Sequence, residues 1–297
     1  MDRRQRVLDL VVPRGRRGVE IGPLSRPLIL RGDGDVLYAD HLPTEGLRRK
    51  YRGHPGLGAE GTDAIVPVDV VLDGRTLAEA LGARAPVDYV VASHVLEHIP
   101  DPVGWLRAAA EALREGGTVC LLVPDRRFTF DHFRRDSTPG EIVAAHLAGL
   151  RTPPAAHVYE QIARACAVEP AAIWRGEAVD PTPLPGGGPE EALRVAREVA
   201  GTGDYVDAHC LVVTPHGFAV ILAEILALGL LPFEVAAYRP TGRNEAEFVV
   251  LLRKASDLSA GARAASVPRL DPRRHRDLPR PGWRTRLAAG LRGRRGA

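Results

Sequence analysis

The chain has 297 residues, 45% of them hydrophobic and 26% charged, a balance typical of a globular protein rather than a disordered one. Its three widely spaced cysteines exclude a disulfide framework, no apolar run reaches the roughly 18 residues of a membrane helix, and we expect a cytoplasmic protein. The formal charge of +3 is uneven: residues 271–297 hold nine arginines and two aspartates, so this end carries +7 and the remainder −4, which does not predict specific nucleic-acid binding.

The first half of the chain alternates short apolar runs with helical patterns. Strands are predicted at residues 18–22, 36–40, 64–70, 87–93 and 118–124. Helices are predicted at residues 44–51, 76–81 and 101–114. Strands and helices that alternate at this spacing form right-handed crossovers. The pattern therefore predicts an α/β fold with a doubly wound, mostly parallel sheet.

The second half is less regular. Thr138 and Glu141 form a capping box that predicts a helix to about residue 147, and two more helical stretches flank a loop rich in proline and glycine at 179–189. Further on we predict a strand at 209–213, a helix at 215–228 capped by Thr214, and an antiparallel strand pair at 233–238 and 247–253. We expect one domain over 1–255, with 134–206 as a helical insertion and substrate lid, and a basic, flexible tail over 256–297.

The residues at the strand ends are the candidates for ligand binding and catalysis, because ligands of open α/β sheets bind beyond the carboxyl ends of the strands. These ends hold Glu20 and Gly22, Asp40, Asp69, and Ser93 with His94. A turn glycine followed 18 residues later by a carboxylate suits a ligand with a ribose. Asp40 and Asp69 could instead cap the helices that follow them, but the four ends together favour a nucleoside site. The residues after Gly22 are Pro-Leu-Ser-Arg, and the lack of further glycines disfavours a dinucleotide.

The segment 88–131, DYVVASHVLEHIPDPVGWLRAAAEALREGGTVCLLVPDRRFTFD, resembles class I S-adenosylmethionine-dependent methyltransferases of the small-molecule group. The resemblance implies a Rossmann-like fold with a seven-stranded sheet, and S-adenosylmethionine as the cofactor. It also implies that Glu20 and Gly22 contact the methionine part, Asp40 the ribose, Asp69 the adenine amino group, and Ser93 and His94 the sulfonium. The full set of expected cofactor contacts is Glu20, Gly22, Pro23, Asp40, His41, Asp69, Val70, Ser93 and His94.

Such an enzyme is expected to methylate a hydroxyl on a small-molecule, sugar or natural-product acceptor. An oxygen acceptor must lose its proton, and histidine is the natural base near neutral pH. The candidate catalytic residues are His94, His209 and Asp207, each of which could instead have a packing role. Asp125, Arg127 and His132 could bind a polar or anionic acceptor, or belong to a solvated loop.

Residues 94–98, HVLEH, match the H-x-x-E-H signature of a class of zinc proteases. They directly follow a predicted strand and precede Pro100, so a turn is expected there and not the long helix that the signature needs. Some methyltransferases of polyprenyl phenols carry E-x-x-E-H at this place and bind magnesium. His94 replaces the first carboxylate here, and magnesium prefers oxygen ligands, so we assign no metal.

Two features leave alternatives open. Trp283, Leu287 and Leu291 recur among arginines near the end of the chain, which predicts either weak contact with an anionic membrane surface or a solubilising tail. The glycine-poor turn after Gly22 also fits a non-catalytic member of the fold that binds a cofactor or partner. A magnesium-assisted methyltransferase at a membrane surface is a further alternative. The expected partner is a small-molecule or glycan acceptor, with no specific nucleic acid.

Overall fold

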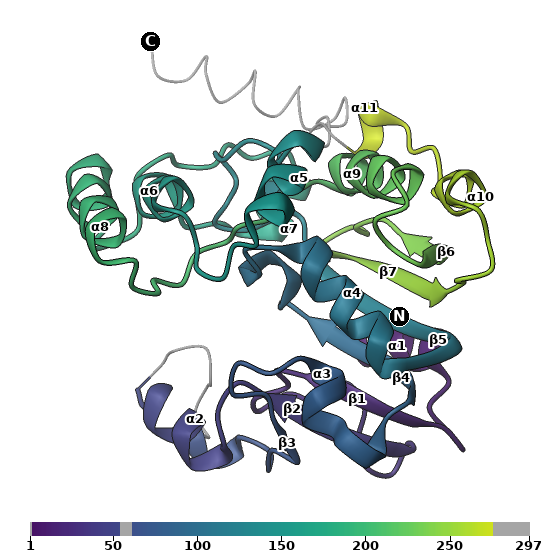
Figure 1. Cartoon of the computed structure of the whole chain (residues 1–297). Helices are drawn as coiled ribbons and strands as arrows, with labels where there is room; N and C mark the ends of the chain where they lie inside the picture. The colour runs from purple at the N-terminus through teal and green to yellow at the C-terminus, as the bar shows by residue number, and fades with distance from the viewer. Residues whose placement is uncertain (1, 54–60, 276–297) are drawn as a thin grey trace.

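The computed structural model describes residues 2–53 and 61–275, and its centre is one seven-stranded sheet in the order β3-β2-β1-β4-β5-β7-β6 (Figure 1). The strands from β1 to β5 are parallel, while β7 runs antiparallel to both β5 and β6. The predicted doubly wound, mostly parallel sheet with a late antiparallel pair is therefore confirmed. The strands are β1 (Arg17–Ile21), β2 (Asp35–Asp40), β3 (Val70–Val71), β4 (Val87–Ser93), β5 (Leu113–Pro124), β6 (Phe233–Arg239) and β7 (Glu247–Lys254).

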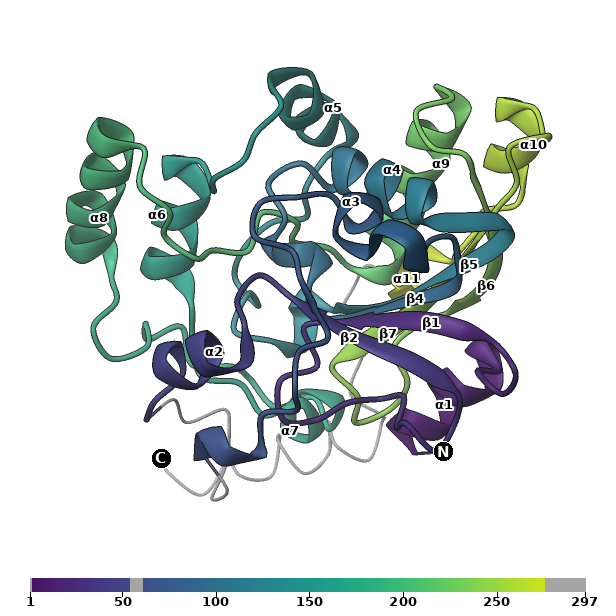
Figure 2. The same cartoon turned by 60° about the horizontal axis from the view of Figure 1, so that its bottom comes forward.

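Helices cover both faces of this sheet. Figure 2 shows α3, α4 and α9 on one side of it and α1 on the other. The α-helices are α1 (Arg3–Val11), α2 (Thr44–Lys50), α3 (Leu77–Leu81), α4 (Pro102–Ala112), α5 (Pro139–Ala148), α6 (Ala155–Arg164), α7 (Pro170–Trp174), α8 (Pro189–Thr202), α9 (Pro215–Ala227), α10 (Ala260–Ala265) and α11 (Pro272–His275). Short 3-10 helices lie at Gly61–Ala64, Gly82–Arg84, Leu96–His98 and Arg126–Phe128.

The central strands supply both halves of the core because successive side chains of a strand point to opposite faces. In β4, Val90 and Ala92 pack in the cluster with α4 and α9, whereas Tyr89 and Val91 pack in the cluster with α1. Burying a valine or leucine side chain contributes about 1.5–3 kcal/mol. Because β4 is buried on both faces, its sequence is a continuous run of mostly apolar residues.

Helix starts were the most exact of the sequence predictions. The side chain of Thr138 accepts a hydrogen bond from the Glu141 amide while the Glu141 carboxylate accepts one from the Thr138 amide, so the predicted capping box is confirmed at the start of α5. The hydroxyl of Thr214 likewise accepts a hydrogen bond from the Gly217 amide at the start of α9. These signals are local, which explains why the sequence alone located them.

Three predicted elements differ from the structure. The strand expected at 64–70 is reduced to Val70–Val71, because Pro67 has no amide to donate to a ladder and the Val68 amide donates to the Thr44 hydroxyl instead. The strand expected at 209–213 is absent; there the Cys210 and Leu211 amides donate to the carbonyl of Glu97. The helix expected to end at residue 114 ends at Ala112, where β5 begins. Helix α1 was not predicted.

The predicted insertion at 134–206 holds helices α5 to α8. Figure 1 shows α6 and α8 side by side and away from the sheet, where they share a small apolar cluster of Val158, Val199 and Ala208. The role of this insertion as a substrate lid stays a prediction.

The first part of the expected tail is not a free segment, which corrects that prediction. Helix α10 packs against α9 and β6, the amide of Val235 donates a 2.7 Å hydrogen bond to the Ser266 hydroxyl, and Val267 is partly buried against the core. Residues 276–297, with the amphipathic pattern at Trp283, Leu287 and Leu291, lie outside the described residues.

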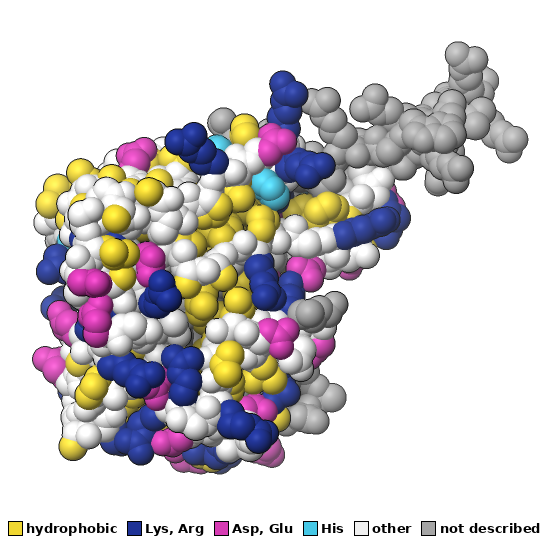
Figure 3. All heavy atoms as spheres, turned by 90° about the vertical axis from the view of Figure 1, so that its right-hand side faces the viewer, with side chains coloured by type: hydrophobic (Ala, Val, Ile, Leu, Met, Phe, Trp, Pro, Cys, Tyr) yellow, Lys and Arg dark blue, Asp and Glu magenta, His cyan; other side chains and the backbone are white. Residues whose placement is uncertain are grey.

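On the face drawn in Figure 3, basic and acidic side chains are interspersed around hydrophobic ones. Within 2–53 and 61–275, every helix is too short or too polar to cross a bilayer.

Candidate active site

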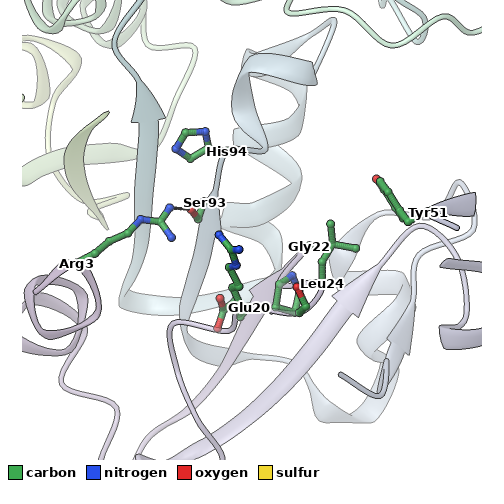
Figure 4. A pocket seen from close by; sticks show the side chains of 10 residues that line it. Arg3, Glu20, Gly22, Leu24, Tyr51, Ser93 and His94 are labelled. Carbon is green, nitrogen blue, oxygen red and sulfur yellow. Dashed lines mark hydrogen bonds between the residues drawn. The ribbon is translucent and has the colours of Figure 1, made fainter. Parts of the chain in front are cut away.

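A cavity of about 220 Å³ opens at the carboxyl ends of β1 and β4, the place where the sheet order predicts a ligand. Figure 4 shows Arg3, Ser93 and His94 on one side of it and Tyr51 on the opposite side, with Gly22 and Leu24 between them. The cavity is lined by Arg3, Glu20, Gly22, Pro23, Leu24, Ser25, Arg26, Tyr51, Ser93 and His94. Of the nine predicted cofactor residues, five lie in this lining: Glu20, Gly22, Pro23, Ser93 and His94.

The turn after β1 depends on Gly22. Its φ of +66° is in the left-handed region, and an added Cβ would lie 3.4 Å from the Val95 side chain. Leu24 also has a positive φ of +47°, and its side chain packs with Leu47 and Ile65. Leu24 thus replaces a second glycine by anchoring the turn in an apolar cluster. The resulting loop borders the cavity without the glycine-rich pattern of a dinucleotide site.

Glu20 is buried beneath this turn, and its carboxylate is already engaged. Its two oxygens accept hydrogen bonds from the amides of Leu28 and Ile29 at 2.8 to 3.0 Å. Burial raises the pKa of Glu20 to about 7, against the opposing effect of these amides and of Arg3. The carboxyl group therefore titrates near neutrality beside the cavity, and a cation bound there would favour its ionised form.

A charged network around Glu247, at the start of β7, holds the side of the cavity formed by Arg3, Ser93 and His94. Arg3 of α1 donates to both oxygens of Glu247 at 2.7 and 2.9 Å and to the hydroxyl of Ser93, while His94 Nε2 lies 2.8 Å from Glu247 Oε2. Burial alone would raise the pKa of Glu247, but the hydrogen bonds from His94 and Arg3 outweigh it and lower that pKa to about 2. Glu247 is therefore an ionised carboxylate that orients the His94 ring.

His94 has an unusual backbone. Its φ of +52° is in the left-handed region, which costs a residue other than glycine of the order of 1–3 kcal/mol. The strain turns a half-exposed imidazole toward the cavity directly after β4, with Nδ1 3.5 Å from Glu97 Oε1. Strain of this kind is common at functional sites, and here it positions a side chain that could accept a proton.

The carboxylates predicted for the nucleoside lie in different environments. Asp40 ends β2, bonds to the amide and the ring of His41, and contributes to the raised pKa of Tyr51, for which burial is the largest cause. Asp40 therefore lies near the cavity that Tyr51 lines, and His41 is half-exposed beside it. Asp69 instead binds Arg31 and the amide of Tyr38.

Of Glu20, Asp40 and Asp69, the structure places only Glu20 in the lining of this cavity, and the approach of all three to one ligand stays a prediction. The other four predicted cofactor residues, Asp40, His41, Asp69 and Val70, do not line the cavity, and Val70 is buried in β3. The assignment to Asp69 assumed that β3 ends there, whereas β3 ends at Val71 and the carboxylate beyond it is Asp73. Within the described residues, the Asp73 side chain makes no hydrogen bond.

A second group of ionisable side chains lies next to His94. Glu97, His98 and His209 each place a possible ligand atom within 4.8 Å of the other two. His98 Nδ1 is 2.8 Å from an oxygen of Asp207, and His209 Nδ1 is 2.5 Å from an oxygen of Asp131. Burial lowers the pKa of His98, but the hydrogen bond to Asp207 and then the negative charges of Glu97, Asp207 and Asp131 raise it overall. The structure thus brings the predicted His209 and Asp207 to this cluster and not to the cavity lining.

The residues expected to bind the acceptor are Asp125, Arg127 and His132, and the first two lie in the interior of the fold. Asp125 and Arg127 are both buried, joined by an ion pair, and Asp125 also accepts a hydrogen bond from the Thr241 hydroxyl. Neither lines the cavity, and the two charges satisfy each other inside the fold, so acceptor binding by this pair stays a prediction. His132 bonds to the carbonyl of Arg127 and is likewise outside the cavity lining.

Residues 34–169 match the model of a family described as a methyltransferase domain. Over residues 34–169, which include β2, β4 and β5, the chain therefore carries a methyltransferase domain. This confirms the resemblance found in the sequence, and S-adenosylmethionine is the cofactor of that family. No curated protein matches the sequence significantly.

Solved structures of methyltransferases resemble the chain at low similarity. The CcbJ methyltransferase from Streptomyces caelestis is 14% identical, with a TM-score of 0.37 over 85% of this chain and 93% of its own. An S-adenosylmethionine-dependent methyltransferase from Methanosarcina mazei is 15% identical, with a TM-score of 0.39 over 84% and 97%. Magnesium protoporphyrin IX methyltransferase from Synechocystis, solved with S-adenosylhomocysteine, is 14% identical, with a TM-score of 0.38 over 85% and 82%. Scores at this level support no inference about the acceptor.

Sequence reasoning missed five of the lining residues. Leu24, Ser25 and Arg26 directly follow Gly22, so their place in the turn was a usable signal. No signal in the sequence identified Arg3 and Tyr51 as lining residues. Arg3 reaches the cavity because Val7 and Val11 of α1 pack against the sheet, and Tyr51 reaches it because of the position of α2, which it directly follows.

Proposed function

We propose that this protein is an S-adenosylmethionine-dependent methyltransferase that transfers a methyl group to a hydroxyl of a small-molecule or glycan acceptor. The observation that carries the proposal is the cavity at the ends of β1 and β4, in a chain whose residues 34–169 match a methyltransferase domain. In a doubly wound sheet this edge is where a nucleoside ligand binds.

The residues around the cavity match the groups of the cofactor. Glu20 offers a negative charge to the ammonium and sulfonium groups, and Asp40 offers carboxylate oxygens to the ribose hydroxyls. Arg26 is exposed in the lining and makes no side-chain hydrogen bond or ion pair within 2–53 and 61–275, so it is available for the cofactor carboxylate.

His94 is the base in this proposal. Glu247 holds Nε2, which leaves Nδ1 to accept the proton of the acceptor hydroxyl. S-adenosylmethionine bound in the cavity would supply the methyl group to the freed oxygen and would keep its sulfur as the neutral thioether of S-adenosylhomocysteine, while His94 holds the proton. Most of the rate enhancement comes from holding oxygen and methyl in line, and the base adds about 10²–10⁴-fold.

Two measurements on the full chain test the proposal. Calorimetry with S-adenosylmethionine is expected to give saturable binding of one cofactor per chain. Incubation with the cofactor and a library of hydroxylated small molecules and glycans is expected to yield S-adenosylhomocysteine and products heavier by one methylene, detected by mass spectrometry.

The outcomes separate the alternatives. Saturable binding without S-adenosylhomocysteine for any acceptor would favour the non-catalytic alternative. A folded protein that does not bind the cofactor would contradict both.

A further inference from the structure

We propose that Glu97, His98 and His209 form a binding site for one divalent transition-metal ion of the zinc type, whose open position takes the acceptor hydroxyl. The metal site stands on its own observations. Its use by the acceptor rests on the proposed methyltransferase function.

The first observation is an unsatisfied carboxylate. The Glu97 side chain is fully buried, and neither of its oxygens accepts a hydrogen bond within the described part of the chain. Burying a carboxylate without partners costs free energy, and a bound cation would offset that cost. The nearest nitrogen of an ion-pair partner is His94 Nδ1 at 3.5 Å, beyond normal hydrogen-bond length.

The second observation is the orientation of the two histidines. Each has Nδ1 hydrogen-bonded to a carboxylate, His98 to Asp207 and His209 to Asp131. Histidines that bind metals almost always donate their other ring N–H to a carboxylate or a carbonyl, which fixes the tautomer. With Nδ1 protonated in both rings, each Nε2 is left as an unprotonated ligand.

The supporting groups are themselves held in place. Asp131 also pairs with Arg134, whose guanidinium donates to the carbonyl of His209 at 2.8 Å. The carbonyl of Glu97 accepts hydrogen bonds from the amides of Cys210 and Leu211, which fixes the segment of His209 beside the turn of Glu97. Three distant stretches of chain therefore meet at the three ligand groups.

The donor set and spacing fit a transition metal better than magnesium. Two imidazole nitrogens and one carboxylate oxygen are a set that catalytic zinc sites use, with the fourth position left to water or substrate. Ligand atoms around tetrahedral zinc are about 3.3–3.5 Å apart, from bond lengths near 2.0–2.2 Å. The present separations of up to 4.8 Å would contract by at most about 1.3–1.5 Å on binding, a movement that side-chain rotation can supply.

The place of the cluster gives it a role. Glu97 adjoins His94, which lines the cavity, and His98 is partly exposed. The hydroxyl of Tyr205 donates a hydrogen bond to Asp207, the carboxylate that holds the His98 ring. A hydroxyl bound at the open position would be acidified beside the base and beside the cofactor cavity.

This arrangement differs from the zinc-protease pattern in the sequence. That pattern would pair His94 with His98 on one helix face, whereas Leu96–His98 is a 3-10 turn and His94 bonds to Glu247. The third ligand, His209, comes from a segment that no local motif identifies.

Cobalt titration of the full chain, stripped with a chelator, tests the site directly. Wild type is expected to bind one Co²⁺ per chain with visible absorption bands that Zn²⁺ abolishes by competition. Glu97→Gln keeps the shape of the side chain and is expected to lower the affinity for Co²⁺ at least about tenfold, and Asp131→Asn about 10–100-fold.

Thermal unfolding provides a second readout. Zn²⁺ is expected to raise the Tm of wild type but not that of Glu97→Gln, because only a ligand of the native state stabilises it. Without metal, Glu97→Gln is expected to melt above wild type, because an amide costs less free energy to bury without a partner than a carboxylate does. The matched control is His146→Ala, since His146 is also a half-buried histidine paired with an aspartate, Asp101, but lies outside the cluster. It is expected to bind metal like wild type.

Three results would overturn the proposal: no stoichiometric Co²⁺ binding by folded wild type, equal affinity in wild type and Glu97→Gln, or equal loss of affinity in His146→Ala. Calorimetry with S-adenosylmethionine on the same samples keeps the two proposals apart. Cofactor binding without metal binding contradicts the metal site alone, and metal binding without cofactor binding contradicts the proposed function while the metal site stands.

Discussion

The cavity beside β1 and the cluster of Glu97, His98 and His209 are neighbours, yet they are built in different ways. The cavity forms where two parallel strands end, with a local turn at Gly22 as its border. The cluster forms where the turn after β4 meets an irregular segment more than a hundred residues later. A cavity of the first kind follows from sheet order. A cluster of the second kind depends on hydrogen bonds between distant segments, such as those to the carbonyl of Glu97.

This difference predicts different consequences for the two regions. Changes in the cavity should affect binding or turnover of the cofactor, whereas changes in the cluster should first affect metal affinity.

The largest effect is expected for His94→Ala. Loss of the base should lower kcat by about 10²–10⁴-fold, with a much smaller change in the Kd of S-adenosylmethionine. Single-turnover kinetics and calorimetry on the same samples measure the two quantities, with His146→Ala as the control. Turnover at the wild-type rate would remove His94 as the base.

An intermediate effect is expected for Asp40→Ala. The loss of charged hydrogen bonds to the ribose should weaken cofactor binding by about 1.5–3 kcal/mol in calorimetry. The paired variant Asp69→Ala should leave that affinity unchanged, but lower the free energy of unfolding by about 1 kcal/mol or more, because the amide of Tyr38 loses its acceptor. A reversed pattern would restore Asp69 as a cofactor residue.

The smallest effect is expected in the pH dependence of binding. Because the pKa of Glu20 is raised to about 7, its negative charge develops as pH increases through that value. Affinity for the cationic cofactor should therefore rise by roughly 1 kcal/mol between pH 6 and 8, and Glu20→Gln should flatten the profile. Equal profiles for wild type and variant would show that Glu20 does not face the cofactor.

The same titration affects stability with a defined sign. The folded state binds the Glu20 proton more tightly than the unfolded state, whose pKa is near 4.5. The contribution of Glu20 to stability is therefore fully present below about pH 4.5 and is lost as pH rises toward 7.

The sequence predicted the sheet and the cavity because both depend on local patterns. Apolar runs located β4 and β5, and parallel pairing then brought Gly22 and Ser93 to one edge. The sequence does not show which contacts form between residues that are distant in the chain. Asp125 and Arg127 look like exposed loop residues in the sequence, but the fold buries them against each other.

The metal assignment left open by the sequence has a similar cause. Residues 94–98 are adjacent in the chain, so local reasoning grouped His94 with Glu97 and His98. The backbone at His94 directs Nε2 to Glu247, with Nδ1 3.5 Å from Glu97, and His209 is the histidine that joins Glu97 and His98 in the cluster. Strain at one residue and two amide hydrogen bonds therefore decide which histidines meet.

The most direct test of the central claim is a crystal structure of the protein with S-adenosylhomocysteine. We expect the ligand between Gly22 and His94, with its ribose within hydrogen-bond distance of Asp40 and its sulfur facing His94. A ligand bound elsewhere on the protein, or an adenosine held by Asp69, would contradict the account.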